Sequence, residues 1–247
     1  MHIFFYCDQP SPIMEAAKEC AVLHSPKSTV ITLAGATSKR ADRFRNLAKL
    51  LPTANPFSHE IACLLRWIYL LDYMQTEKVE AVVACDTDCL VFQDMEAEED
   101  GWFRDFDYTL GDTGDYHRQC SSSLIRLPVL QAFVAFLFSR NGVELHDMRA
   151  WADFRTQNPQ FRCGNYGEIR NGTVYDLNLS TELHRYESEQ IGPDFRKRVG
   201  FWRGMPFVRI LNSDRLIRFK LLHCWSWSKA YMTTFIKTSK ETLASDV

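Results

Sequence analysis

Short apolar runs alternate with helical periodicity along the first 92 residues of the chain. HIFFYC (2–7), STVITLA (28–34) and VEAVVAC (79–85) are apolar, β-branched runs of strand length. The third run is continuously apolar, which is typical of a strand that is covered on both faces of a sheet. A helix is predicted after Ser11-Pro12, and apolar residues recur at the 3.6-residue period from Asn55-Pro56 to about Gln75. This β-α-β-α-β order predicts an α/β fold with a nucleotide-type N-terminal half.

The pattern is less regular after residue 92. Residues 107–110 and 121–127 are predicted strands, and helices are predicted from Pro128 to about Arg140 and after Asp147, which is expected to be the helix N-cap. Residues 206–211 and 215–225 predict a hairpin with its turn at 212–214, and residues 226–240 predict a closing helix. Residues 35–54 are polar and mixed and give no clear element, residues 95–101 are expected to form a charged surface turn, and residues 158–195 are expected to form loops and short strands. No repeat or linker divides the chain, so one α/β domain over residues 1–247 is expected.

Composition and charge exclude several classes of protein. Of the 247 residues, 46% are hydrophobic and 24% charged, and the formal net charge is −2 with no long basic run, which disfavours a nucleic acid partner. No apolar run is long enough for a secretory signal or a membrane span, so a soluble, cytoplasmic protein is expected. The eight cysteines lie mostly in core-like runs without a CxxC pair, which favours reduced core thiols over disulfides or a structural zinc site.

Two carboxylates follow the most apolar strand. Asp86-Thr87-Asp88 comes directly after VEAVVAC, and the apolar run LVF follows it. In extended backbone the residues i and i+2 point to the same side, so both carboxylates are expected to face one region beyond the end of the sheet. Two like charges at that distance favour a divalent cation between them, either Mg²⁺ or Mn²⁺. The structural alternative is a solvated turn at the end of the strand.

Three stretches together resemble the nucleotide-sugar-dependent glycosyltransferases of the GT-A fold. Asp86-Thr87-Asp88 matches the DxD motif of that fold, and FSHEIACLLRWIYLLDYMQ is similar to the Arg-bearing helix that precedes it. LLHCWSWSKAYM resembles the motif in which a His and a Lys six residues later close over the donor diphosphate. The resemblance covers essentially the whole chain. It implies a mixed Rossmann-type sheet flanked by helices, with a nucleotide-binding half (1–92) and an acceptor half with a C-terminal closing segment (93–247).

The resemblance assigns a metal site and a leaving-group site. Asp86, Asp88 and His223 are the implied ligands of Mn²⁺ or Mg²⁺, and the mixed His and carboxylate set favours Mn²⁺. Lys229 is implied to neutralise the diphosphate as it leaves, which makes Asp86, Asp88 and Lys229 catalytic candidates. Taken alone, His223 is better explained as a core or surface histidine, and Lys229 as a surface residue at a helix end. The spacing between the two residues and the DxD motif upstream make both explanations of His223 about equal.

The implied donor is a nucleotide-diphosphate hexose, with UDP as the expected nucleotide. Arg66 is expected to hold the DxD loop or to approach the diphosphate, although an arginine whose stem covers Trp67 or Tyr69 explains the position as well. Tyr6, Cys7 and Asp8 end the first strand, which meets the base and ribose in this fold.

The implied acceptor is a hydroxyl of a glycan, a lipid or a protein. Asp112 is the candidate catalytic carboxylate on this side, in GDTGDYH (111–117), and Asp115 of the same loop is a second possibility. Glu168 and Asp176 lie in the irregular segment and are further candidates. The spacing from His223 to Lys229 resembles retaining transferases. Trp225 and Trp227 offer faces for a sugar but suit core packing equally well.

Two other functions fit part of the pattern. DTDCLVF also resembles the first motif of haloacid-dehalogenase-type phosphatases, where the first Asp is the nucleophile. However, 85 residues precede it here, whereas that motif normally lies near the N-terminus. A non-catalytic domain that binds a nucleotide sugar is the other alternative, because a fold does not guarantee activity.

Overall fold

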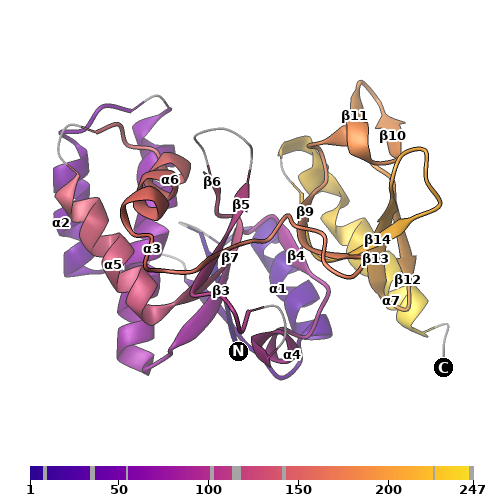
Figure 1. Ribbon diagram of the computed structural model, residues 1–247, viewed down its shortest axis with the longest axis horizontal. Helices are drawn as coiled ribbons and strands as arrows, with labels where there is room; N and C mark the ends of the chain where they lie inside the picture. Colours follow the sequence, from indigo (N-terminus) through magenta and orange to yellow (C-terminus); the bar gives the residue numbers. More distant parts are fainter. Residues whose placement is uncertain are drawn as a thin grey trace.

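The chain is described by a computed structural model (Figure 1). The residues that it describes are 1–7, 10–33, 37–53, 55–100, 103–112, 118–140, 143–224 and 226–244.

The larger sheet is mixed, and its strands run in the order β2-β1-β3-β7-β5-β6, with β8 beside β5. β1, β2 and β3 are parallel, and β7 is antiparallel to both β3 and β5. Phe5 lies opposite Cys85, so the carboxyl ends of β1 and β3 lie at the same edge. The strands are β1 (His2–Tyr6), β2 (Thr29–Leu33), β3 (Ala81–Cys85), β5 (Tyr108–Asp112), β6 (Arg118–Gln119), β7 (Ser122–Arg126) and β8 (Cys163–Asn165).

Both faces of this sheet are covered, which explains why its central strand β3 is apolar at every position. Phe4, Val82 and Ala84 belong to a core formed with α2, α3, α5 and α6, whereas Ile3 and Val83 belong to a second core on the other face. Figure 1 shows the four helices together on the left, with α1 on the opposite side of the sheet. The helices are α1 (Pro12–His24), α2 (Lys39–Ala48), α3 (Phe57–Glu77), α5 (Leu127–Ser139) and α6 (Asp147–Gln157).

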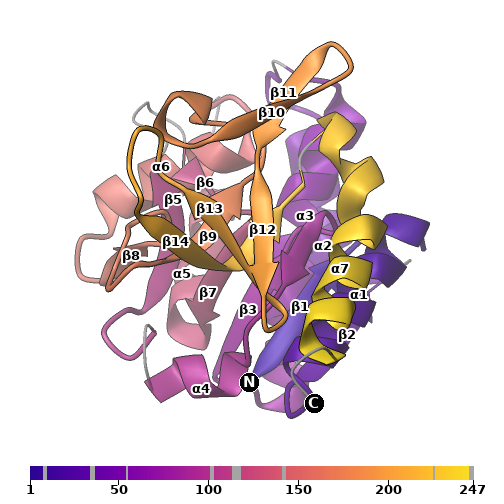
Figure 2. The same cartoon turned by 90° about the vertical axis from the view of Figure 1, so that its right-hand side faces the viewer.

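A second sheet is centred on β14 and faces the viewer in Figure 2. The antiparallel β13 pairs with the first part of β14 and β4 with its last part, while the parallel β9 runs along its other edge. A separate hairpin of β10 and β11 projects from this end of the molecule. These strands are β4 (Cys89–Val91), β9 (Thr173–Asn178), β10 (Ser188–Ile191), β11 (Asp194–Lys197), β12 (Val199–Trp202), β13 (Met205–Arg209) and β14 (Leu216–His223).

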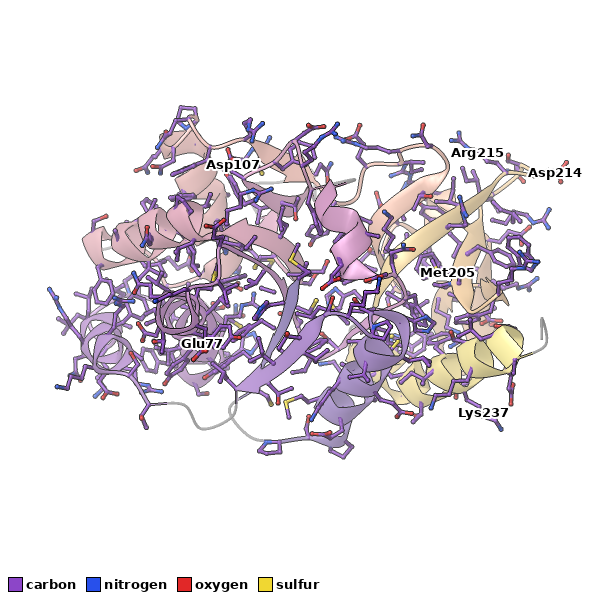
Figure 3. The ribbon with its side chains drawn as sticks, turned by 90° about the horizontal axis from the view of Figure 1, so that it is seen from below. Glu77, Asp107, Met205, Asp214, Arg215 and Lys237 are labelled. Atoms are coloured by element: carbon purple, nitrogen blue, oxygen red, sulfur yellow. The ribbon has the colours of Figure 1, made fainter. Side chains whose placement is uncertain are left out.

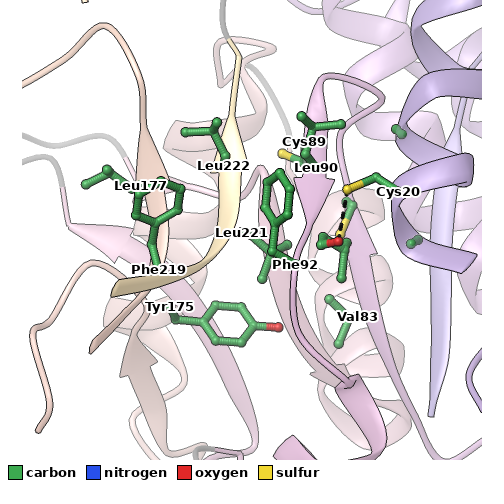
Figure 4. Packing of buried hydrophobic residues seen from close by; sticks show 14 of the residues in the cluster. Cys20, Val83, Cys89, Leu90, Phe92, Tyr175, Leu177, Phe219, Leu221 and Leu222 are labelled. Atoms are coloured by element: carbon green, nitrogen blue, oxygen red, sulfur yellow. Dashed lines mark hydrogen bonds between the residues drawn. The ribbon is translucent and has the colours of Figure 1, made fainter. Parts of the chain in front are cut away.

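The chain passes from the first sheet to the second between β3 and β4. β4 is fully buried, and Figure 4 shows Leu90 and Phe92 packed among Leu221, Phe219 and Tyr175. On the side of α1, the Cys20 thiol donates a hydrogen bond to the Val91 carbonyl at 3.1 Å. The short strand therefore joins the two sheets through one apolar core.

The C-terminal segment closes the second sheet. A 3-10 helix, Ser226–Tyr231, follows β14 and leads into α7 (Met232–Ala244), which packs on α1 and β12. Lys229 therefore stands on this 3-10 helix and not in the long helix that was predicted for residues 226–240.

Most predicted elements are confirmed, including the three N-terminal strands, the helix after Pro56 and the hairpin at 212–214. Two polar segments contain helices that the sequence pattern does not predict. Ser38 caps α2 by accepting a hydrogen bond from the Ala41 backbone N–H at 3.2 Å, and residues 95–101 contain α4 (Met95–Asp100). Among the described residues, every helix is too short or too polar to cross a bilayer.

Candidate functional site

The DxD segment is a turn between the two sheets. The Cys89 N–H donates to the Asp86 carbonyl at 3.0 Å, which closes the turn, and the Asp86 N–H donates to the Ser121 carbonyl at 2.6 Å. At the other end, the Cys224 N–H donates to the Asp88 carbonyl at 2.8 Å. The backbone is therefore not extended here, contrary to the assumption made from the sequence, and the two carboxylates have different partners.

Asp88 meets two residues of the C-terminal motif. Its Oδ1 lies 3.3 Å from His223 Nε2, and its Oδ2 lies 3.0 Å from Lys229 Nζ. The Asp88 and His223 side chains are 7% and 8% exposed, whereas Lys229 is 36% exposed. Burial favours the neutral acid, but the hydrogen bond and charge of His223, together with Lys229, outweigh it and lower the pKa of Asp88 to about 2. Asp88 is therefore a buried carboxylate that is paired with a buried imidazole and with a partly exposed ammonium group.

His223 is held in place by the strands on both sides of it. It is the last residue of β14 and lies opposite Cys89 on one side and Asn178 on the other. Its Nδ1 is 3.4 Å from the Asn178 side-chain nitrogen. Burial acts to lower the pKa of His223, but Asp88 and the nearby Asp176 raise it to about 9. The imidazole is thus oriented with Nε2 toward Asp88 by a residue that lies far from it in the sequence.

Asp86 is directed away from this group, toward α3. Arg66 Nη1 pairs with Asp86 Oδ1, and Arg66 Nη2 pairs with Asp147 Oδ2 at 3.0 Å. The guanidinium also lies 4.6 Å from the centre of the Trp67 ring and donates to the Cys120 thiol at 3.0 Å. Burial raises the pKa of Asp86 to about 6 although Arg66 acts in the opposite direction. Arg66 therefore fixes the turn to α3 and α6.

Asp147 is a member of this group that the sequence did not identify. It was predicted to be the N-cap of α6, but His146 is the cap, and its ring accepts from the Arg149 N–H at 3.5 Å. Asp147 is the first residue of the helix, and its Oδ1 accepts from the Met148 N–H at 2.7 Å. A carboxylate at the start of a helix looks like a cap in sequence, so its contact with Arg66 had no local pattern to reveal it.

A buried polar network lies behind the turn. Asp176, on β9, accepts hydrogen bonds from the hydroxyls of Ser121 at 3.1 Å and of Ser122. Ser121 also lies 3.1 Å from the Tyr166 hydroxyl. Burial raises the pKa of Asp176 above its usual range. Asp176 is a candidate for the acceptor side from its position in the sequence, whereas the structure places it inside the protein, near His223.

Of the remaining candidates, Tyr6 and Asp112 end β1 and β5, whose carboxyl ends lie at the same edge of the sheet as that of β3. Tyr6 stacks on Tyr69 with ring centres 5.5 Å apart, and the Cys7 N–H donates to the Leu33 carbonyl at 3.2 Å. Asp112 ends β5, where its backbone pairs with Arg118 of β6. The ion pair of Glu168 with Arg170 accounts for that carboxylate without a site. Asp8, Asp115 and Trp225 lie outside the described residues.

The side chains near Asp88 suit a divalent cation. Asp88, His223 and Cys89 each offer a ligand atom within 4.8 Å of the others. Cys89 is the weakest of the three, because burial raises the pKa of its thiol well above the usual range and the thiol donates to the Ser121 carbonyl. A carboxylate and an imidazole remain, a donor set that suits Mn²⁺. Asp86 does not belong to this group, because its charge is directed to Arg66.

Comparison with known proteins gives a likeness in structure but not in sequence. No protein-family model and no curated protein sequence matches the chain. A crystal structure of the galactosyltransferase LgtC with donor and acceptor sugar analogues has a TM-score of 0.55 and 13% identity, over 96% of each chain. An apo structure of mouse xyloside xylosyltransferase 1 covers 73% of this chain and 88% of its own, with 9% identity and a TM-score of 0.47. The likeness to the galactosyltransferase establishes that this chain has a GT-A-like α/β fold, with a mixed central sheet flanked by helices.

Proposed function

We propose that this chain is a metal-dependent glycosyltransferase that transfers a hexose from a UDP-linked donor to a hydroxyl of a glycan, lipid or protein acceptor. The GT-A-like fold supports the reaction class, since structural likeness to glycosyltransferases suggests transferase activity. The observation that carries the proposal is the meeting of Asp88, His223 and Lys229 at one point between the two sheets. His223 and Lys229 are far from Asp88 in the sequence, yet their side chains contact this residue of the DxD motif.

Asp88 and His223 are the residues that would hold the cation. When bound, Mn²⁺ or Mg²⁺ supplies Lewis-acid stabilisation of the negative charge on a diphosphate leaving group. Lys229 is exposed enough to move from Asp88 to a diphosphate oxygen, where its charge favours departure of the nucleotide. His223 and Asp88 are more deeply buried, so they form the fixed part of the site and Lys229 the adjustable part.

Arg66 and Asp86 act as the support of the turn. Their ion pair, together with Asp147, is mostly buried and ties the DxD turn to α3 and α6. Tyr6 and Cys7 end the neighbouring strand β1 and are proposed to bind the base and ribose. In this proposal residues 1–92 form the nucleotide-binding half and 93–247 the acceptor half of one domain, with Asp112 on the acceptor side.

The test is a panel of nucleotide sugars, each with and without Mn²⁺, measured by release of the nucleoside diphosphate and by melting temperature. One donor should give release that EDTA and Asp88→Asn abolish. A ligand at 100 times its Kd stabilises the folded state by about 2.7 kcal/mol, so a rise in melting temperature should accompany release. Asp214→Asn is the matched control, because this carboxylate is fully exposed in the turn between β13 and β14 (Figure 3).

Three outcomes would overturn the proposal. Full metal-dependent release of the nucleoside diphosphate by Asp88→Asn would show that Asp88 is not a ligand of the metal. Stabilisation by UDP without transfer from any donor would indicate a non-catalytic binding domain. Hydrolysis of a generic phosphate ester, with no response to any nucleotide sugar, would indicate a phosphatase.

A further inference from the structure

A second group of metal-ligating side chains lies where α3 and α6 begin. Glu60, His146 and Asp147 each offer one ligand atom, and these atoms lie within 4.8 Å of one another. Glu60 is in the first turn of α3, while His146 caps α6 and Asp147 begins it. None of the three belongs to the group of Asp88, Cys89 and His223.

Glu60 is buried and lacks a partner for one of its oxygens. The residue is 2% exposed, and its side chain accepts a hydrogen bond from the Asn55 amide. Its Oε2 is buried and has no hydrogen-bond partner among the described residues. Burying a carboxylate oxygen without a partner is costly unless a cation or a donor compensates it. The structure therefore contains a ligand atom whose partner is still to be supplied.

The charges around Glu60 do not balance. Arg66 pairs with both Asp86 and Asp147, and no described lysine or arginine pairs with Glu60. One guanidinium thus serves a buried region that contains three carboxylates. A divalent cation would correct the excess.

We infer that Glu60, His146 and Asp147 form a second divalent-cation site of the Mn²⁺ class. Two ligands of one ion, each bound at about 2.0–2.2 Å, lie at most about 4.4 Å apart. This is close to the 4.8 Å within which the three atoms lie, so only a small side-chain adjustment is needed. Carboxylates suit Mn²⁺, and the imidazole adds a borderline nitrogen ligand. Asp147 links this site to the DxD turn through its contact with Arg66.

The test measures binding of Mn²⁺ alone to the full chain, by the loss of the free-ion EPR signal. Glu60→Gln removes the charge but keeps an oxygen that can accept from Asn55. His146→Asn removes the imidazole but keeps a residue that caps helices well. The matched control is Glu77→Gln at the exposed far end of α3 (Figure 3). Glu60→Gln and His146→Asn should each lose one bound ion or bind that ion at least tenfold more weakly, while Glu77→Gln should bind Mn²⁺ like the wild type.

A background of Asp88→Asn separates this site from the proposed catalytic one. In that background, one ion should still bind and should be lost when Glu60→Gln is added. If the proposed function fails, Asp88→Asn leaves the stoichiometry unchanged, but Glu60→Gln still removes an ion. The inference is overturned if folded Glu60→Gln and His146→Asn bind Mn²⁺ with the stoichiometry and affinity of Glu77→Gln.

Discussion

Replacing Arg66 by methionine should destabilise the protein far more than an ordinary loss of one ion pair. The Arg66 side chain is 13% exposed and is shared by Asp86 and Asp147, whose side chains are 31% and 11% exposed. The substitution preserves the apolar stem but leaves two carboxylates without their cation. Removing one partner of a buried pair costs about 3–5 kcal/mol, a large part of a typical stability of about 5–15 kcal/mol.

Urea denaturation measures this cost directly. With a slope of about 2 kcal/mol per molar urea, the midpoint should fall by about 1.5–2.5 M. The control is Arg40→Met, because Arg40 pairs with Asp72 at 2.6 Å while both side chains are about one-third exposed. A surface pair of this kind contributes about 0–1 kcal/mol, so the midpoint should hardly move.

The pH dependence gives an independent check of the cause. Asp86 has a pKa of about 6 with Arg66 in place, and the pKa must rise further when Arg66 is removed. Below that pKa the folded variant binds a proton that the unfolded chain does not, so the variant recovers stability as the pH falls from 8 toward 6. Adding Asp86→Asn should recover part of the loss at pH 8. Equal costs for Arg66→Met and Arg40→Met would refute the description of this group as a buried charge cluster.

Two further predictions concern the buried groups His24 and Lys197, which have no assigned role in the proposed reaction. Burial lowers the pKa of His24 to about 4, and its Nε2 lies 2.9 Å from the Ser239 hydroxyl. The unfolded chain therefore binds the extra proton first as the pH falls, and the free energy of unfolding should decrease by up to about 3 kcal/mol between pH 6.5 and 4. Chemical denaturation of His24→Gln should show a smaller decrease over the same range. Burial lowers the pKa of Lys197 to about 8, and its Nζ donates to the carbonyls of Asn178 and Thr181. The unfolded chain binds the extra proton between pH 8 and 10.5, so the free energy of unfolding should rise with pH by up to about 3 kcal/mol in that range. The same rise in a Lys197→Met variant would show that Lys197 is not its cause.

The elements that the sequence predicted correctly are those with strong local patterns. β3 is apolar throughout because both of its faces are buried, and α3 keeps its period over 21 residues. The sequence did not predict α2 because most of its residues are polar. The helix buries Ala41, Phe44 and Ala48, and its clearest sequence signal is the N-cap residue Ser38. A short amphipathic helix of this kind depends on the surface it packs against, which no local pattern contains.

The candidate site was predictable in its members but not in its arrangement. Asp88, His223 and Lys229 were singled out together, and the structure brings them within hydrogen-bonding or ion-pairing distance. The sequence did not predict that the two aspartates have different partners. An extended strand would direct both carboxylates to the same side, whereas the turn that begins at Asp86 directs them to different sides. Asn178 was not foreseen either, because its place beside His223 depends on the parallel pairing of β9 with β14.

The position of β4 has a consequence for how the protein is made. During synthesis, β3 and β4 leave the ribosome well before β14, which is the strand that β4 pairs with. Until β14 arrives, β4 is an apolar strand with an unpaired edge, which is the kind of segment that associates with other chains. The pairing of His223 with Cys89 and the contact of His223 with Asp88 then form in the same step. The pairing of β4 with β14 thus buries the exposed edge of β4 and brings His223 to Asp88 at the same time. A nascent chain that can still aggregate through β4 therefore also lacks the candidate site.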